Sequence, residues 1–133
     1  TGVVHSEYNA SRTDPLHLLR SWIVPERRGL TPEYAERSYP EAERLGRWRV
    51  AASRDGRDGS IVVHQDVTVL TATLRPGDAA RYELAAGRGA WLHVATGTAT
   101  VNGRELTAGD PAAVDGEAIE VTGDGEVLLF DLA

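Results

Sequence analysis

From Trp48 onward, the chain consists of short runs in which apolar and polar residues alternate, and glycine-containing turns separate these runs. Alternation with a period of two is typical of β-strands that have one buried and one exposed face. Many short strands with closely spaced turns favour a sandwich or a barrel, so we predict an all-β domain. The predicted strands are Arg47–Ala52, Ser60–Gln65, Thr68–Leu74, Ala80–Leu84, Ala90–Thr96, Thr98–Val101, Ala112–Val114, Ala118–Thr122 and Glu126–Leu132. The side chains expected to point into the core include Val50, Val69, Leu92, Val114, Val121 and Leu129.

Four short segments of this region have the composition of turns. Asn102-Gly103 fits a two-residue type I′ hairpin, because both positions of that turn need a positive φ. Arg75–Asp78 and Thr107–Asp110 each precede another predicted strand, and Gly123–Gly125 separates the last two strands. We therefore predict a hairpin at Asn102-Gly103 and a turn at each of the other three segments.

The first 46 residues differ from the rest, because they contain four of the six prolines and alternate short apolar runs with charged loops. We predict strands at Gly2–Tyr8 and Leu16–Val24, followed by a polar connection at Glu26–Ser38. Pro40–Gly46 has proline at its start, acidic residues in its first turn and glycine at its end. That order predicts a short helix of about one to two turns.

Composition narrows the chemistry of this chain of 133 residues. The absence of Cys excludes disulfides and thiolate chemistry, leaves His, Asp and Glu as metal ligands, and favours the cytoplasm. All 14 basic residues are Arg, which excludes a Schiff base on Lys. The net charge of −6 disfavours direct binding to nucleic acid or to acidic lipids. Because the apolar runs are far shorter than the roughly 20 residues that span a bilayer, we also expect no membrane partner.

The candidate catalytic and metal-binding groups are histidines and one carboxylate. A strand at Gly2–Tyr8 would place His5 and Glu7 on one face, where an imidazole and a carboxylate can share a cation. From spacing alone, a hydrogen-bonded or solvated pair is more common, and two ligands do not complete a metal site. The other histidines favour structural positions: a core or interface residue at His17, a strand-end polar cluster at His64, and a surface or barrel-lining residue at His93.

Three segments near the start extend the His5 and Glu7 pair into a longer pattern. Thr1–Asn9 has the sequence TGVVHSEYN, Leu16–Pro25 is LHLLRSWIVP, and Gly29–Tyr34 begins with Gly-Leu-Thr-Pro. This series resembles the pirin family of two-barrel cupin proteins, and especially the bacterial pirins similar to quercetin dioxygenase. Val63–Asp66 and Glu126–Leu132 are similar to the second barrel and the C-terminal signature of that family.

The resemblance implies a fold and a division of the chain. The expected fold is all-β, with a cupin-like double-stranded β-helix (jelly-roll barrel) at 47–133, preceded by strands left over from a first cupin barrel. Residues 1–46 would be the tail end of that N-terminal cupin plus a linker. Because such strands would have no partner within this chain, we expect two copies to pair or exchange strands along residues 1–25 as a homodimer.

The resemblance also implies a metal centre. Pirins hold iron or another divalent transition metal in the N-terminal cupin, through a His-x-His pair and through a His-x-Glu pair that corresponds here to His5 and Glu7. The chain begins too late to contain the His-x-His pair, and the second barrel has no paired His to replace it. We therefore expect this chain alone to bind little metal and to be inactive, with Glu7 as the candidate base on a flavonol hydroxyl in the intact parent.

Three functions are open at this point. The first is a metal-dependent quercetin 2,3-dioxygenase acting on a flavonol-like small molecule, of which this chain is the C-terminal part. The second is a cupin-shaped protein-interaction module, as in pirins that resemble transcriptional co-regulators. The third is a barrel that binds a small ligand or a sugar, with candidate contacts at Trp48, Trp91, Tyr82 and Arg81, for which core and rim positions are the more common role.

Overall fold

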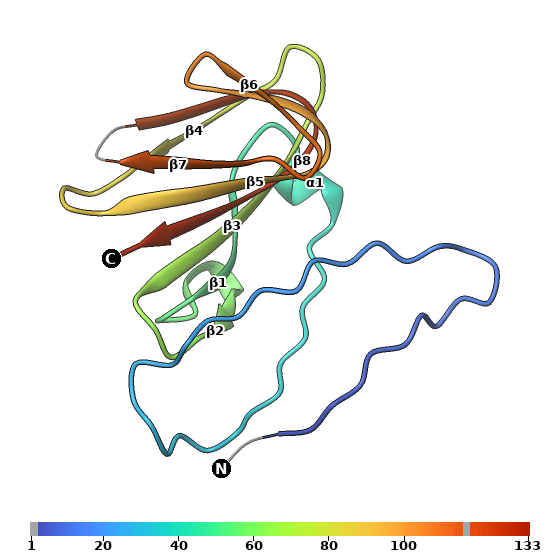
Figure 1. The fold of residues 1–133 in the computed structure, drawn as a ribbon, viewed down its shortest axis with the longest axis vertical. Helices are drawn as coiled ribbons and strands as arrows, with labels where there is room; N and C mark the ends of the chain where they lie inside the picture. Colours follow the sequence, from blue (N-terminus) through green and yellow to red (C-terminus); the bar gives the residue numbers. More distant parts are fainter. Residues whose placement is uncertain (1–2, 116–117) are drawn as a thin grey trace.

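The computed structural model describes residues 3–115 and 118–133, and its regular secondary structure is almost entirely β. The strands are β1 (Arg49–Ser53), β2 (Ile61–Val62), β3 (Val67–Leu74), β4 (Ala79–Glu83), β5 (Gly89–Val101), β6 (Arg104–Thr107), β7 (Pro111–Asp115) and β8 (Ala118–Leu132). The helical elements are the short helix α1 (Glu41–Arg44) and the 3-10 turn η1 (Arg57–Gly59). Figure 1 shows the strands curving around one another as a barrel, from which the N-terminal chain extends as a wide loop. The all-β prediction is confirmed.

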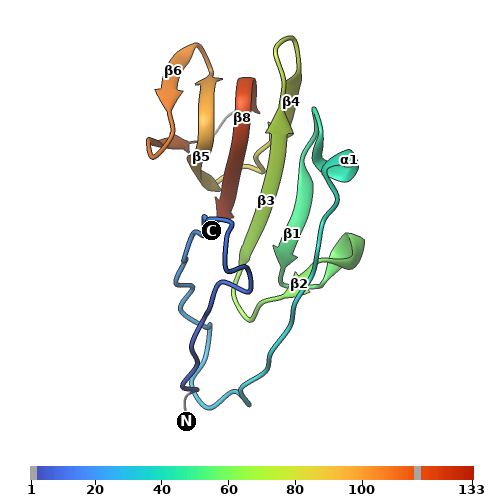
Figure 2. The same ribbon diagram turned by 90° about the vertical axis from the view of Figure 1, so that its right-hand side faces the viewer.

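Two long strands, β5 and β8, hold the barrel together. They pair antiparallel from Gly89 with Leu132 to Val101 with Val121. In addition β8 pairs with β3 and β4, and β5 pairs with β6 and β7, so each long strand serves both sides of the barrel. The main sheet has the order β2-β1-β3-β8-β5-β6. Figure 2, turned by 90°, shows this sheet folding over on itself, as in a jelly roll.

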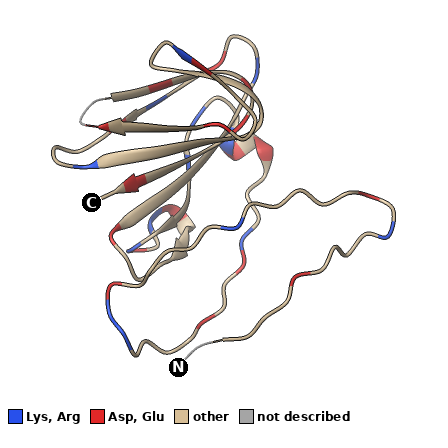
Figure 3. Ribbon diagram, viewed as in Figure 1, with Lys and Arg blue, Asp and Glu red and all other residues tan. Residues whose placement is uncertain are grey.

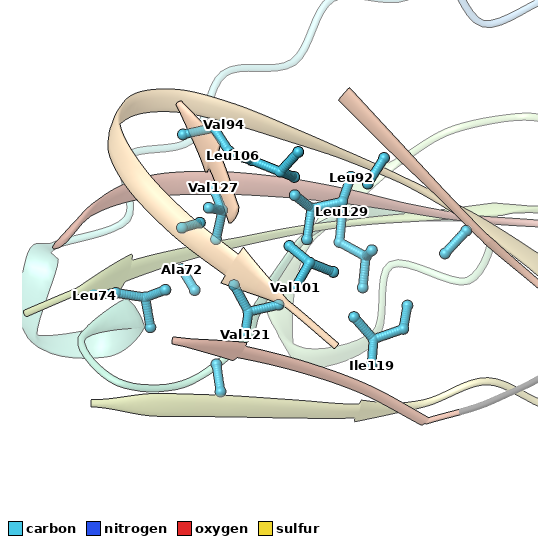
Figure 4. Packing of buried hydrophobic residues seen from close by; sticks show 14 of the residues in the cluster. Ala72, Leu74, Leu92, Val94, Val101, Leu106, Ile119, Val121, Val127 and Leu129 are labelled. Atoms are coloured by element: carbon cyan, nitrogen blue, oxygen red, sulfur yellow. The ribbon is translucent and has the colours of Figure 1, made fainter. Parts of the chain in front are cut away.

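One apolar core fills the space between the folded halves of the sheet. Figure 4 shows its side chains converging from β3, β5, β6 and β8, and the innermost are Leu74, Leu92, Val94, Ile119, Val121, Val127 and Leu129. Among the predicted inward positions, Leu92, Val121 and Leu129 are confirmed as core, and Val50 and Val114 pack against it.

The prediction for Val69 is wrong. Strand β3 buries Leu70, Ala72 and Leu74, so Val69 lies on the opposite face, paired with Phe130 of β8. Apolar side chains occur on both faces at this end of β3, and alternation alone therefore does not fix which face is inward.

The predicted turn at Gly123–Gly125 is also wrong, because β8 continues through it where it crosses β5. A Cβ atom at Gly125 would lie 2.0 Å from the carbonyl oxygen of Thr96, and one at Gly97 would lie 2.0 Å from that of Asp124. The glycines are therefore needed for close approach of two backbones rather than for a turn. A shift of register in β5 lies nearby, and the two strands predicted at Ala90–Thr96 and Thr98–Val101 form one bent strand.

Local turn and helix predictions agree better with the structure. Asn102 and Gly103 connect β5 to β6, and their φ angles are both positive, at 47° and 83°. The helix predicted at Pro40–Gly46 is present as α1. The strand predicted at Ser60–Gln65 is shorter than expected, because only Ile61–Val62 pairs with β1.

The N-terminal chain contains neither strand nor helix from residue 3 to residue 40. The strands predicted at Gly2–Tyr8 and Leu16–Val24 are therefore wrong for this structure, although Gly2 itself lies outside the described residues. A strand exists only through hydrogen bonds to a neighbour, and none of the strand pairings recorded for the described residues involves residues 3–24.

Charged residues are distributed along the whole described ribbon in Figure 3, where basic and acidic positions are interspersed on both the barrel and the N-terminal chain. Among the described residues, helices are too short and too polar to cross a membrane.

Candidate functional site

His5 and Glu7 lie close together in the extended N-terminal chain, as their spacing predicts. The Nε2 atom of His5 is 3.9 Å from Oε1 of Glu7, and the two side chains are 61% and 46% exposed. Extended backbone points residues i and i+2 to the same side even where no strand partner is present. The structure therefore brings the two predicted ligands together.

Arg20 adds a contact that the sequence did not predict. Its guanidinium donates a hydrogen bond to Oε2 of Glu7 and forms an ion pair with it. Glu7 thus has one carboxylate oxygen near His5 and the other occupied by a cation. Nothing in the spacing of Glu7 and Arg20 could have indicated this pair, because the chain reverses direction between them.

The residues that the structure describes do not by themselves fit a transition-metal centre. Within residues 3–115 and 118–133, no three or more His, Cys, Asp or Glu side chains are grouped so that they could hold a metal ion. The pair of His5 and Glu7 is exposed, and one of its members is already bound to Arg20. Such a pair leaves most of a metal's coordination positions to water, and binding is then weak.

The remaining histidines do not join this pair into one site. His17 is exposed, so it is not in the core of this chain. The carbonyl oxygen of His64 accepts a hydrogen bond from the backbone N–H of Glu26 at 2.8 Å, which gives this residue a structural role. His93 is half-buried, in β5, and lines a groove beside Arg20.

The four residues considered for a sugar site lie apart. Trp48 packs against the core, the hydroxyl of Tyr82 donates to Asp131, Arg81 pairs with Glu83, and Trp91 lies 45% exposed on the outer face of the sheet. Trp48, Arg81 and Trp91 line three different grooves. The structure therefore does not assemble them around one pocket.

A buried carboxylate organises one end of the barrel. The Asp131 side chain is 8% exposed and accepts hydrogen bonds from the Tyr82 hydroxyl, at 2.6 Å, and from Nε of Arg88. Arg88 also donates to Asp66 at 3.1 Å. Burial, together with the hydrogen bond to Asp131, raises the pKa of Tyr82 to about 12. The cluster of Tyr82, Arg88 and Asp131 is thus internally satisfied, and its hydrogen bonds make it structural.

Comparison with known proteins identifies the family of this chain. The family described as "Quercetinase C-terminal cupin domain" matches residues 50–132. A quercetin 2,3-dioxygenase of Escherichia coli K12 is 41% identical over 135 residues, which cover 99% of this chain and 57% of that protein. The chain belongs to the pirin family. The resemblance seen in the sequence is confirmed.

Other relatives agree with this assignment. A pirin-like protein of Caulobacter vibrioides is 33% identical to this pirin chain over 137 residues, which are 59% of its own length. The crystal structure of YhhW from Escherichia coli matches with a TM-score of 0.77 and 36% identity, over 84% of this chain and 48% of YhhW. A nickel(II) complex of the same protein, described as a bacterial pirin, matches with a TM-score of 0.75. The cupin-like fold is therefore confirmed, and the chain spans little more than half the length of these curated relatives.

Proposed function

We propose that this pirin chain is the C-terminal part of a two-barrel protein similar to the metal-dependent quercetin 2,3-dioxygenases, with a flavonol-like small molecule as substrate. The observation that carries the proposal is the proximity of His5 and Glu7 in a chain that is 41% identical to a quercetin 2,3-dioxygenase. In this proposal residues 1–46 are the tail end of the N-terminal cupin plus a linker, and residues 47–133 are the C-terminal cupin-like barrel. The absence of Cys supports a cytoplasmic location.

His5 and Glu7 are half of a ligand set in this proposal, and a His-x-His pair from another barrel supplies the other half. The nickel(II) complex of a similar pirin supports a divalent transition metal, iron or another, as the cofactor of the intact protein. Glu7 is also the proposed base for the flavonol hydroxyl. Because two exposed ligands hold a metal poorly, the chain alone is proposed to be inactive.

The test compares this chain with a chimera in which only the part of the Escherichia coli relative that precedes its match to this chain is joined in front of residue 1. Metal content is measured by mass spectrometry of the purified proteins, and quercetin turnover by the loss of its absorbance. We expect little metal and no turnover in the chain alone, and both in the chimera. His5→Ala and Glu7→Ala should abolish metal binding in the chimera, whereas the exposed control His17→Ala should not. Near-stoichiometric metal on the chain alone that is lost on Glu7→Ala would contradict the proposal, because the metal site would then be complete without the rest of the N-terminal barrel.

Exposed apolar side chains favour a second function, that of an interaction module. Among the described residues, all the exposed large apolar side chains except Val62, Trp91 and Leu132 lie between residues 3 and 34. An extended segment with unpaired backbone groups and apolar side chains tends to pair with a strand of another molecule. We therefore infer that two copies pair or exchange strands along residues 1–25, as a homodimer. Light scattering over a range of concentrations should show a dimer, and a strict monomer at every concentration would contradict this.

A further inference from the structure

A segment of the N-terminal chain is fastened across the outer face of the barrel. Residues 16–25, which we call the strap, lie against the outward side chains of β5 and β8. One contact holds the end of the strap to the barrel, from Gln65 Nε2 to the carbonyl oxygen of Val24 at 2.8 Å. The next residue, Glu26, is held as well, through its N–H to the carbonyl oxygen of His64 at 2.8 Å and through its carboxylate to Arg54 at 2.6 Å. Figure 1 shows the strap, in blue, reaching the β2 end of the barrel.

A groove of about 690 Å³ lies between the strap and the sheet. Trp22 and Ile23 line it from the strap, and Trp91 and Phe130 line it from β5 and β8. Its volume is within the range of roughly 300–1,000 Å³ that is usual for small-molecule sites. Both indoles are accessible, since Trp22 is 88% exposed and Trp91 is 45% exposed. The groove thus offers aromatic surfaces from two different elements to a ligand between them.

A carboxylate at one end of the groove is suited to a hydroxylated ligand. At one end Asp66 uses Oδ1 to accept from Arg88, and its Oδ2 has no hydrogen-bond partner within the described residues. An adjoining groove, which shares Ser21, Trp91 and Phe130 with the first, is lined by His93 and by Arg20, whose guanidinium is already paired with Glu7. A carboxylate oxygen of this kind can accept a hydrogen bond from a hydroxyl group of a ligand.

We propose that this groove is a binding site for a planar aromatic molecule that carries hydroxyl groups, separate from the pair of His5 and Glu7. The aromatic body packs between Trp22 and the surface of Trp91, and one hydroxyl donates to Asp66. A purely aliphatic ligand would neither stack on the indole rings nor donate a hydrogen bond to the carboxylate of Asp66. The site needs no metal, so it does not rest on the proposed dioxygenase function.

The probe is quercetin, a planar polyphenol, and the comparison ligand is flavone, which is planar but has no hydroxyl groups. Binding is measured with a metal chelator present, by fluorescence titration corrected for absorbance and by calorimetry. We expect saturable binding of quercetin that is weakened about tenfold or more by Trp91→Ala, because a stacking surface is lost. Asp66→Ala should weaken quercetin binding and leave flavone binding unchanged. Val62→Ala, at an exposed apolar position outside the groove, is the matched control.

Circular dichroism establishes that each variant is folded, which the exposed position of Trp91 leads us to expect. Equal quercetin affinity of Trp91→Ala and the parent chain would overturn the proposal. Decanoate binding as tightly as quercetin would also overturn it, because the groove would then be merely apolar. If sedimentation shows that Trp91→Ala dissociates a dimer while quercetin does not bind, the groove is an interface between copies and the proposal is wrong. The titration contains no metal, so its result does not depend on whether the dioxygenase test succeeds or fails.

Discussion

Replacing Asp131 with Ala should lower the free energy of unfolding at pH 7 by about 3 kcal/mol. The carboxylate is 8% exposed and accepts hydrogen bonds from Tyr82 and Arg88. A hydrogen bond that involves a charged group contributes about 1.5–3 kcal/mol, so two would give about 3–6 kcal/mol. The lower end applies, because Arg88 is 20% exposed and keeps its ion pair with Asp66. With a urea m-value of about 1.5 kcal/mol/M, the midpoint should fall by about 2 M.

Urea unfolding followed by circular dichroism measures this loss, and Glu83→Ala is the matched control. The pair of Arg81 and Glu83 has side chains that are 64% and 67% exposed. Pairs of this kind contribute about 0–1 kcal/mol. Asp131→Asn keeps the size of the side chain but removes its charge, and it should lose less than Asp131→Ala. If Asp131→Ala shifts the midpoint no further than Glu83→Ala does, the cluster does not stabilise the barrel and the reasoning is refuted.

Two further predictions concern the strand crossing and the phenol. Gly125→Ala should lower the free energy of unfolding by more than about 3 kcal/mol, because its Cβ would lie 2.0 Å from the carbonyl oxygen of Thr96. Gly77→Ala is the control: its Cβ would have no atom within 4 Å, and the loss should be about 1 kcal/mol. Equal decreases in the thermal unfolding midpoint of these two variants would contradict the close approach of β5 and β8 at Gly125. The Tyr82 pKa of about 12 lies above its unfolded value of about 10, so the stability it contributes is complete below about pH 10 and falls as pH rises toward 12. The stability of Tyr82→Phe should not fall in this way at alkaline pH. Identical profiles of stability against pH for the variant and the parent chain would contradict the prediction.

The strands of the barrel could be predicted because most of them have one apolar face. In β5 and β8, Leu92, Val121 and Leu129 alternate with polar or half-exposed neighbours, and their inward positions follow from the period of two. At Val69 both faces carry apolar residues, since the outer face there continues to Phe130 and the strap. Local alternation holds no information about which of two apolar faces meets the core.

The N-terminal strands and the glycines of β8 could not be predicted for a related reason. A strand needs a partner, and the apolar run of residues 16–24 carries no signal that says whether this chain provides one. Gly123–Gly125 has the composition of a turn, but Gly123 is required by the close approach of Thr98 and Ala99 on β5, and Gly125 by that of Thr96 and Gly97. In both cases the deciding contact is with a segment distant along the chain.

Of the candidate site, the sequence could predict only what is local. His5 and Glu7 lie together because positions i and i+2 of extended chain share a side, whereas the pair of Glu7 and Arg20 depends on a reversal of the chain. Asp131 did carry a signal that could have been used. It continues the inward alternation of Val127 and Leu129, and a carboxylate at an inward position needs a buried donor. Alternation therefore predicts that a partner exists, and only the fold shows that Arg88 and Tyr82 provide it.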